Sequence, residues 1–137
     1  MTEGLLSPAT IFSVALGSAL GGVARYWLGL VVDRRRSSAL PSGTLLVNIS
    51  GALVIGMLAA FLVMPADGRI SMIWAVSVTG FLGSYTTVSA FSLQTLIMLR
   101  EGRVRSGFVY VATSVSGCLL AATLGLFAGR FALHLAS

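Results

Sequence analysis

Residues 80–92 read GFLGSYTTVSAFS and place helix-weakening and hydrogen-bonding residues inside an apolar stretch long enough to cross a membrane. Gly80 and Gly83 weaken a helix at this point. The hydroxyl groups that follow can compete for backbone hydrogen bonds; they belong to Thr86, Thr87, Ser89 and Ser92. Together these residues permit a break in the helix, although glycine pairs in membrane helices also occur for packing alone.

A break in the middle of a membrane frees backbone groups that must be buried in protein or line a cavity. Freed carbonyl oxygens suit a small hard cation such as Na⁺. The N-terminus of a half-helix and hydroxyl donors suit an anion. The segment therefore indicates an ion-binding site rather than a plain membrane anchor.

Two further sets of polar residues lie inside apolar stretches. Asn48, in GTLLVNISG, needs partners for its amide, and either an ion or a hydrogen bond between helices would supply them. Tyr110, Ser114 and Cys118 recur at a spacing of four residues, so they lie along one face of a helix. Hydroxyls on such a face either point into a cavity or bond back to their own helix.

Charged residues are nearly absent from the predicted spans. Arg25 is the one exception, and it either extends to the membrane interface or draws anions toward the mouth of a pore. No acidic residue falls inside a span, whereas a proton-coupled cation carrier usually needs an intramembrane carboxylate. The absence of a nucleophile–base pair argues against an enzyme. The chemistry that remains is hydrogen-bond donation in a narrow, dry place, which fits the passage of a small anion.

Membrane helices must position these residues, because the composition excludes a soluble domain. The chain has 137 residues, of which 56% are hydrophobic and 9% charged, against about 25% charged in soluble domains. Apolar stretches long enough to span a bilayer occur at residues 11–32, 44–64, 70–99 and 108–131. We expect an all-α membrane protein, a single domain over residues 1–137, with four transmembrane helices and the third broken at its centre.

Small residues recur at a spacing of four in the first and last spans, and such stripes let helix backbones approach closely. They are Gly17 and Gly21, then Gly117, Ala121, Gly125 and Gly129. Packing within one subunit would explain them. The longer stripe indicates a helix that is buried on several sides, which favours an oligomer.

All nine basic residues are arginines, and their distribution predicts the orientation in the membrane. Six, at positions 34–36, 100, 103 and 105, flank one side of the predicted spans, whereas Arg69 and Arg130 lie on the side of the termini. The positive-inside rule places the six in the cytoplasm and both termini outside. Because the arginines cluster at the ends of apolar stretches, they indicate contact with anionic lipid rather than with nucleic acid.

Three motifs resemble the Fluc (CrcB-type) family of fluoride channels, and the likeness covers essentially the whole chain. They are GGVARYWLG in the first span, GTLLVN at the start of the second and TGFLGSYTTVSAFS in the third. The resemblance implies an antiparallel dimer in the cytoplasmic (inner) membrane. It also implies narrow pores that export fluoride passively, and a structural Na⁺ at the dimer centre.

The resemblance assigns roles to individual residues. Backbone carbonyls of Gly83 and Thr86 would hold Na⁺. The residues that would line the fluoride pore by this resemblance are Asn48, Val88, Phe91, Tyr110 and Ser114. From the run of hydroxyls beyond the glycines we add Thr87, Ser89 and Ser92 to the predicted pore lining. A phenylalanine presents a positive ring edge, which can meet an anion edge-on.

Two features depart from the family pattern. Val88 stands where the family has a second phenylalanine, and the arginine bias of six to two differs from the balance expected of a chain that inserts both ways. The partner is therefore either a second copy or a homologue of opposite bias. Alternatives to a channel are a small four-helix multidrug or cation exporter, and a non-conducting membrane assembly subunit whose polar residues serve packing.

Overall fold

The structure, a computed structural model, describes residues 7–35, 40–61 and 72–136. Its elements are α1 (Pro8–Arg35), α2 (Ser42–Phe61), α3 (Met72–Trp74), the π-helix η1 (Ala75–Leu82), α4 (Gly83–Tyr85), α5 (Val88–Arg100) and α6 (Val104–Ala136). These ranges contain no strand, so the all-α class is confirmed for the described part of the chain. Within it, α1, α2 and α6 are long and apolar enough to cross a membrane.

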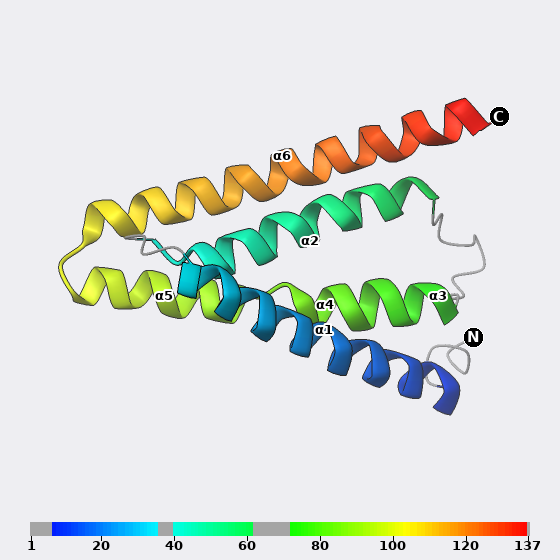
Figure 1. The fold of residues 1–137 in the computed structure, drawn as a ribbon, viewed down its shortest axis with the longest axis horizontal. Helices are drawn as coiled ribbons and strands as arrows, with labels where there is room; N and C mark the ends of the chain where they lie inside the picture. The colour runs from blue at the N-terminus through cyan, green and yellow to red at the C-terminus, as the bar shows by residue number, and fades with distance from the viewer. Residues whose placement is uncertain (1–6, 36–39, 62–71, 137) are drawn as a thin grey trace.

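The long helices run back and forth along one axis (Figure 1). The start of α1, the end of α2 and the end of α6 lie at one end of the molecule, and the turn between α5 and α6 lies at the other. The short elements α3, η1 and α4 continue into α5, and together they traverse the length of the molecule. This arrangement brings the polar segment 80–92 to the middle of the bundle.

Two close helix pairs hold the bundle together, α2 with α6 and α1 with η1. A Cβ atom added to Gly56 would overlap the carbonyl oxygen of Ala122, and one added to Gly125 would overlap that of Leu53. Because backbones approach this closely, the packing that the small-residue stripes predict is confirmed. The stripe of α6 is occupied by α2 of the same chain, so it does not support the expectation of an oligomer.

The helical path from Met72 to Arg100 is interrupted at two threonines. Thr86 has φ −76° and ψ 158°, and Thr87 has φ −151° and ψ 121°, both of them extended. Gly83 is helical, at φ −61° and ψ −33°, and Gly80 lies inside η1 with its Cα against the backbone of α1. The idea that the glycines themselves break the helix is therefore wrong. Gly80 permits close packing of η1 on α1, whereas a Cβ at Gly83 would make only an ordinary contact, and the interruption comes after both.

The turn between α5 and α6 closes the two helices into a hairpin. Gly102 has φ +74°, a conformation that favours glycine over residues with a Cβ. The N–H of Arg103 donates to the carbonyl of Met98 at 2.8 Å, and the N–H of Gly102 donates to that of Leu99 at 3.1 Å. This pair of bonds is a Schellman motif, which ends α5 and reverses the chain.

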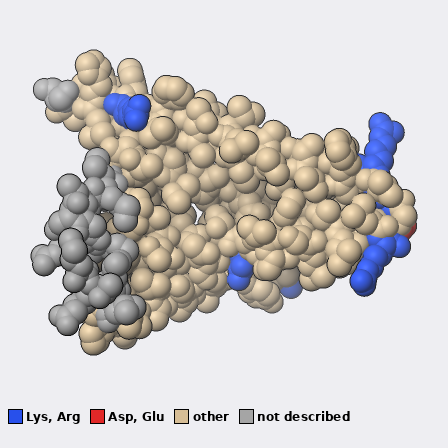
Figure 2. All heavy atoms as spheres, turned by 180° about the vertical axis from the view of Figure 1, so that it is seen from behind, with Lys and Arg blue, Asp and Glu red and all other residues tan. Residues whose placement is uncertain are grey.

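Arginines gather at this end of the molecule (Figure 2). Arg100 is the last residue of α5, and Arg103 and Arg105 flank the start of α6. Two of the arginines on which the predicted orientation depends, Arg36 and Arg69, lie outside the described residues. The orientation in the membrane remains a prediction.

Candidate functional site

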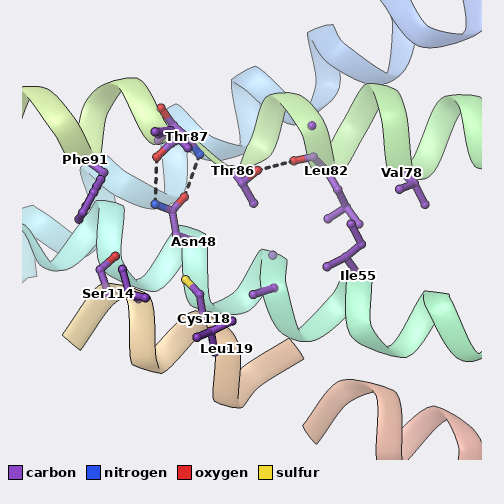
Figure 3. A pocket seen from close by; sticks show the side chains of 15 residues that line it. Asn48, Ile55, Val78, Leu82, Thr86, Thr87, Phe91, Ser114, Cys118 and Leu119 are labelled. Carbon is purple, nitrogen blue, oxygen red and sulfur yellow. Dashed lines mark hydrogen bonds between the residues drawn. The ribbon is translucent and has the colours of Figure 1, made fainter. Parts of the chain in front are cut away.

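A pocket of about 490 Å³ lies beside the interruption, between α2, α6 and the ends of α4 and α5. Its wall is polar at one end, around Asn48, Thr87 and Ser114, and aliphatic at the other, around Leu82 and Ile55 (Figure 3). The predicted site residues in the wall are Asn48, Gly83, Thr86, Thr87, Val88, Phe91 and Ser114. Residues from three separate parts of the sequence are thus brought together.

Asn48 of α2 makes two hydrogen bonds to the extended backbone of Thr87. Its Nδ2 donates to the carbonyl of Thr87 at 3.0 Å, and its Oδ1 accepts the N–H of Thr87 at 2.8 Å. Thr87 is 7% exposed, so both of its backbone groups need a protein partner. The amide carries two N–H donors, and among the described residues only one of them is used.

The interruption removes the helical hydrogen-bond donors of the four carbonyl groups at residues 83–86. In a continuous helix the N–H of Thr87 would bond to the carbonyl of Gly83, but it donates to Asn48 instead. Likewise the N–H of Ala90 donates to the hydroxyl of Thr87 at 3.2 Å rather than to the carbonyl of Thr86. The predicted cation ligands, Gly83 and Thr86, are thus two of the four residues whose carbonyls lose a helical donor, together with Ser84 and Tyr85.

The N-terminus of α5 meets the pocket at the same place. Thr87 caps this helix, and Val88, its first residue, is 76% exposed and lies in the pocket wall. The N-terminus of a helix carries a partial positive charge and favours anions. The freed carbonyls therefore lie before the interruption in sequence, and a helix N-terminus that favours anions lies directly after it.

Phe91 packs against Tyr110, whose hydroxyl belongs to a chain of hydrogen bonds. Its ring lies 5.4 Å, centroid to centroid, from that of Tyr110, which is fully buried. The Tyr110 hydroxyl donates to Oε1 of Gln94 at 2.8 Å, and Nε2 of Gln94 donates to the Thr44 hydroxyl at 2.9 Å. Tyr110, predicted as a pore-lining residue, is thus not part of the pocket wall and supports Phe91 instead.

Sequence reasoning missed Gln94 and Thr44, which complete this chain. A signal was available, because Gln94 is a second amide inside an apolar stretch and must find partners as Asn48 does. The partners are 50 and 16 residues away in sequence, so no local spacing reveals them.

The hydroxyls of α6 differ in what they bond. Ser116 and Thr123 donate back to carbonyls of their own helix, at 2.7 and 2.8 Å. Ser114 is 4% exposed, lies in the pocket wall, and has no hydrogen-bond partner in the described part of the chain. Its hydroxyl is therefore available to the pocket, which Cys118 also lines one turn further on.

Besides Tyr110, three predicted site residues are not brought to the pocket. Ser89 is exposed and its hydroxyl lies 3.1 Å from that of Thr87, and Ser92 is exposed. Arg25 is partly exposed on α1 and is absent from the pocket wall. Their roles in an anion path stay predictions.

Comparison with known proteins places these residues in a family context. Residues 12–126 match the family model described as "CrcB-like protein, Camphor Resistance (CrcB)". A protein of Rhodopseudomonas palustris named fluoride-specific ion channel FluC 2 is 48% identical over 122 residues, covering 85% of this chain and 90% of that protein.

Two other relatives carry the name fluoride-specific ion channel FluC. The protein of Rhizobium meliloti is 43% identical over 116 residues, covering 85% of this chain and 92% of its own length. The protein of Coxiella burnetii (strain Dugway 5J108-111) is 36% identical over 120 residues, covering 88% and 97%. The match to the family model and the extent of these likenesses show that the chain belongs to the CrcB family of membrane ion channels, which are transporters and not enzymes.

Proposed function

We propose that this chain forms a fluoride-selective channel, through which fluoride leaves the cell passively across the inner membrane. The names of its relatives support fluoride as the ion. The observation that carries the proposal is the polar end of the pocket, where an N–H of Asn48 and the hydroxyl of Ser114 converge beside Phe91.

Hydrogen-bond donors matter because fluoride is small and tightly hydrated, and a pore must replace its water. An amide N–H, a hydroxyl, the positive edge of a phenyl ring and the N-terminus of α5 all favour an anion. The negative interior of the cell drives export by about 2.3 kcal/mol per charge per 100 mV, so no other energy source is required.

The membrane topology completes the proposal. Residues 72–100 form the third of four crossings, broken at Thr86 and Thr87, and the arginine bias favours the orientation in which the six clustered arginines face the cytoplasm. A second subunit in antiparallel orientation covers the open side of the pocket, where Val88 is 76% exposed. That subunit is another copy of this chain or a homologue of opposite arginine bias.

The freed carbonyls of Gly83 and Thr86 fit a structural Na⁺ at the centre of such a dimer. Carbonyl oxygen is a suitable ligand for a small hard cation, and an antiparallel partner would contribute a matching pair. When bound, the ion supplies positive charge that lowers the cost of holding an anion nearby. The same donor set would not suit a soft transition metal.

Fluoride efflux from liposomes that contain the purified chain tests the proposal. We expect fluoride efflux without chloride efflux, loss of fluoride efflux in Asn48→Asp, and normal efflux in Ser50→Ala. Ser50 is a matched control because its hydroxyl lies 2.8 Å from that of Tyr85 and outside the pocket wall.

Absence of fluoride efflux, both from the chain alone and with a homologue of opposite arginine bias, would contradict the channel. Efflux that Asn48→Asp leaves unchanged would favour a packing role for the amide. Labelling of a C-terminal tag tests orientation separately, because equal labelling from both faces of the membrane would rule out a single fixed orientation.

A further inference from the structure

A second hollow, which shares no wall residue with the first pocket, lies between the last turns of α1 and the first turns of α2. Its volume is about 440 Å³. Aliphatic side chains of both helices form its walls, among them Leu28 and Val32 of α1 and Leu45 and Ile49 of α2. We refer to this hollow as the α1–α2 groove.

The α1–α2 groove is apolar along its length and polar at one end. Arg35 is the last residue of α1 and Ser42 is the first residue of α2, and both lie in the wall. Leu28 and Ile49 each lie seven residues away from these polar ends, which is about 10 Å along a helix. This is the polarity of a phospholipid, with a charged head and an apolar chain.

The positive charge of Arg35 is not neutralised by the described part of the protein. Asp33, the nearest acid in sequence, accepts the N–H of Gly43 at 2.7 Å and so caps the start of α2. Glu101 pairs with Arg103 at 3.3 Å. Arg35 is exposed and forms no ion pair within the described ranges, so it can meet an anion at the mouth of the groove.

We propose that the α1–α2 groove binds an anionic phospholipid, with an acyl chain along its aliphatic walls and the phosphate at Arg35. Charge complementarity selects this occupant, because the groove offers a cation at its polar end. Anionic lipids are concentrated in the cytoplasmic leaflet, where the orientation proposed above places Arg35. The site does not depend on fluoride conduction.

Fluorescence quenching by brominated lipids tests the site in the full-length chain. The chain has two tryptophans, and Trp27 is 64% exposed and lies one turn before Val31 of the groove wall. In a Trp74→Phe background, Trp27 alone reports which lipid lies beside it. Vesicles of mixed phosphatidylglycerol and phosphatidylcholine are prepared with bromine on one lipid or on the other.

We expect brominated phosphatidylglycerol to be enriched beside Trp27 by about fivefold over its bulk fraction, the factor that corresponds to about 1 kcal/mol from one interfacial arginine. Arg35→Gln should abolish the enrichment and Arg35→Lys should retain most of it. Arg105→Gln is the matched control, because it removes an equal charge from an exposed position outside the groove.

A second variant distinguishes lipid binding within the groove from attraction of anionic lipid to the charge of Arg35 alone. Val32→Phe fills the apolar part and leaves Arg35 in place, so it should also reduce the enrichment. Equal quenching by both lipids in the unmodified chain, or enrichment that survives Val32→Phe, would overturn the proposal. Protection of Trp27 from both lipids would show that another protein surface, such as a second copy, covers the groove, and this too would overturn it.

Discussion

Replacing Asn48 with alanine should destabilise the fold at the interruption between α4 and α5. The change removes two hydrogen bonds, of 3.0 and 2.8 Å, and leaves the buried N–H and carbonyl of Thr87 without partners. Hydrogen bonds between membrane helices are worth about 0.6 kcal/mol on average and up to about 1.7 kcal/mol. Two of them predict a loss of about 1–3 kcal/mol in the free energy of unfolding.

Asn48→Asp should keep one of these two hydrogen bonds and remove the other. A carboxylate still accepts the N–H of Thr87, but it cannot donate to the Thr87 carbonyl, so about half of the stability should be lost. Its negative charge in the pocket wall should lower fluoride efflux by at least about tenfold, equivalent to about 1.4 kcal/mol of added barrier. Asn48→Asp should therefore lose less stability than Asn48→Ala, while its negative charge adds a separate loss of fluoride efflux.

Unfolding in mixed micelles with increasing dodecyl sulfate, followed by circular dichroism, measures the stabilities. Ser50→Ala is the control, because it loses a contact to the neighbouring Tyr85 hydroxyl and touches neither Thr87 nor the pocket. If Asn48→Ala unfolds within about 0.5 kcal/mol of the unmodified chain, the argument that this amide holds the interruption is refuted. Equal efflux in Asn48→Asp and the unmodified chain would refute its role in the anion path.

Three further substitutions test separate parts of the structure. Gly56→Val forces a side chain into the backbone of α6 and should cost about 1–3 kcal/mol in the same unfolding assay, whereas Gly29→Ala meets nothing within 4 Å and should be nearly neutral. Gln94→Leu removes the support of Tyr110 and should lower fluoride efflux by more than its loss of stability explains, as liposome efflux and unfolding measured together would show. Gly102→Ala places a Cβ at φ +74° and should cost about 1 kcal/mol of stability with efflux unchanged, so a stabilising effect would contradict the assigned turn.

Hydrophobicity and glycine spacing predict much of the fold. The apolar stretches at residues 11–32, 44–64 and 108–131 correspond to α1, α2 and α6, although residues 62–64 lie outside the described ranges. The stripe of α6 also indicates its packing role correctly, because small side chains permit close approach whatever the partner. The partner could not be predicted, and it is α2 of the same chain.

The position of the interruption is harder to predict, because a residue distant in sequence decides it. Gly80 and Gly83 are the obvious weak points of the third apolar stretch, yet both remain helical. Thr86 and Thr87 leave the helix where Asn48, 39 residues before Thr87, offers an acceptor and a donor to the extended backbone. Local helix propensity cannot reveal a bond of that kind.

The location of Asn48 allows one side chain to serve both as a structural hydrogen-bonding group and as a donor to an ion. From the sequence, an interhelical hydrogen bond and a role in an ion path compete for one amide. In the structure they need not compete, because the two bonds to Thr87 leave one N–H unused at the pocket wall. A hydroxyl at position 48 has a single O–H, so donating it to the Thr87 carbonyl would leave no donor for the pocket. An acid would set a negative charge between the freed carbonyls and the N-terminus of α5. A neutral amide can hold the interruption open and still present a donor. The structural and ion-binding roles are therefore expected to fail together when the side chain is removed, and separately when it is made acidic.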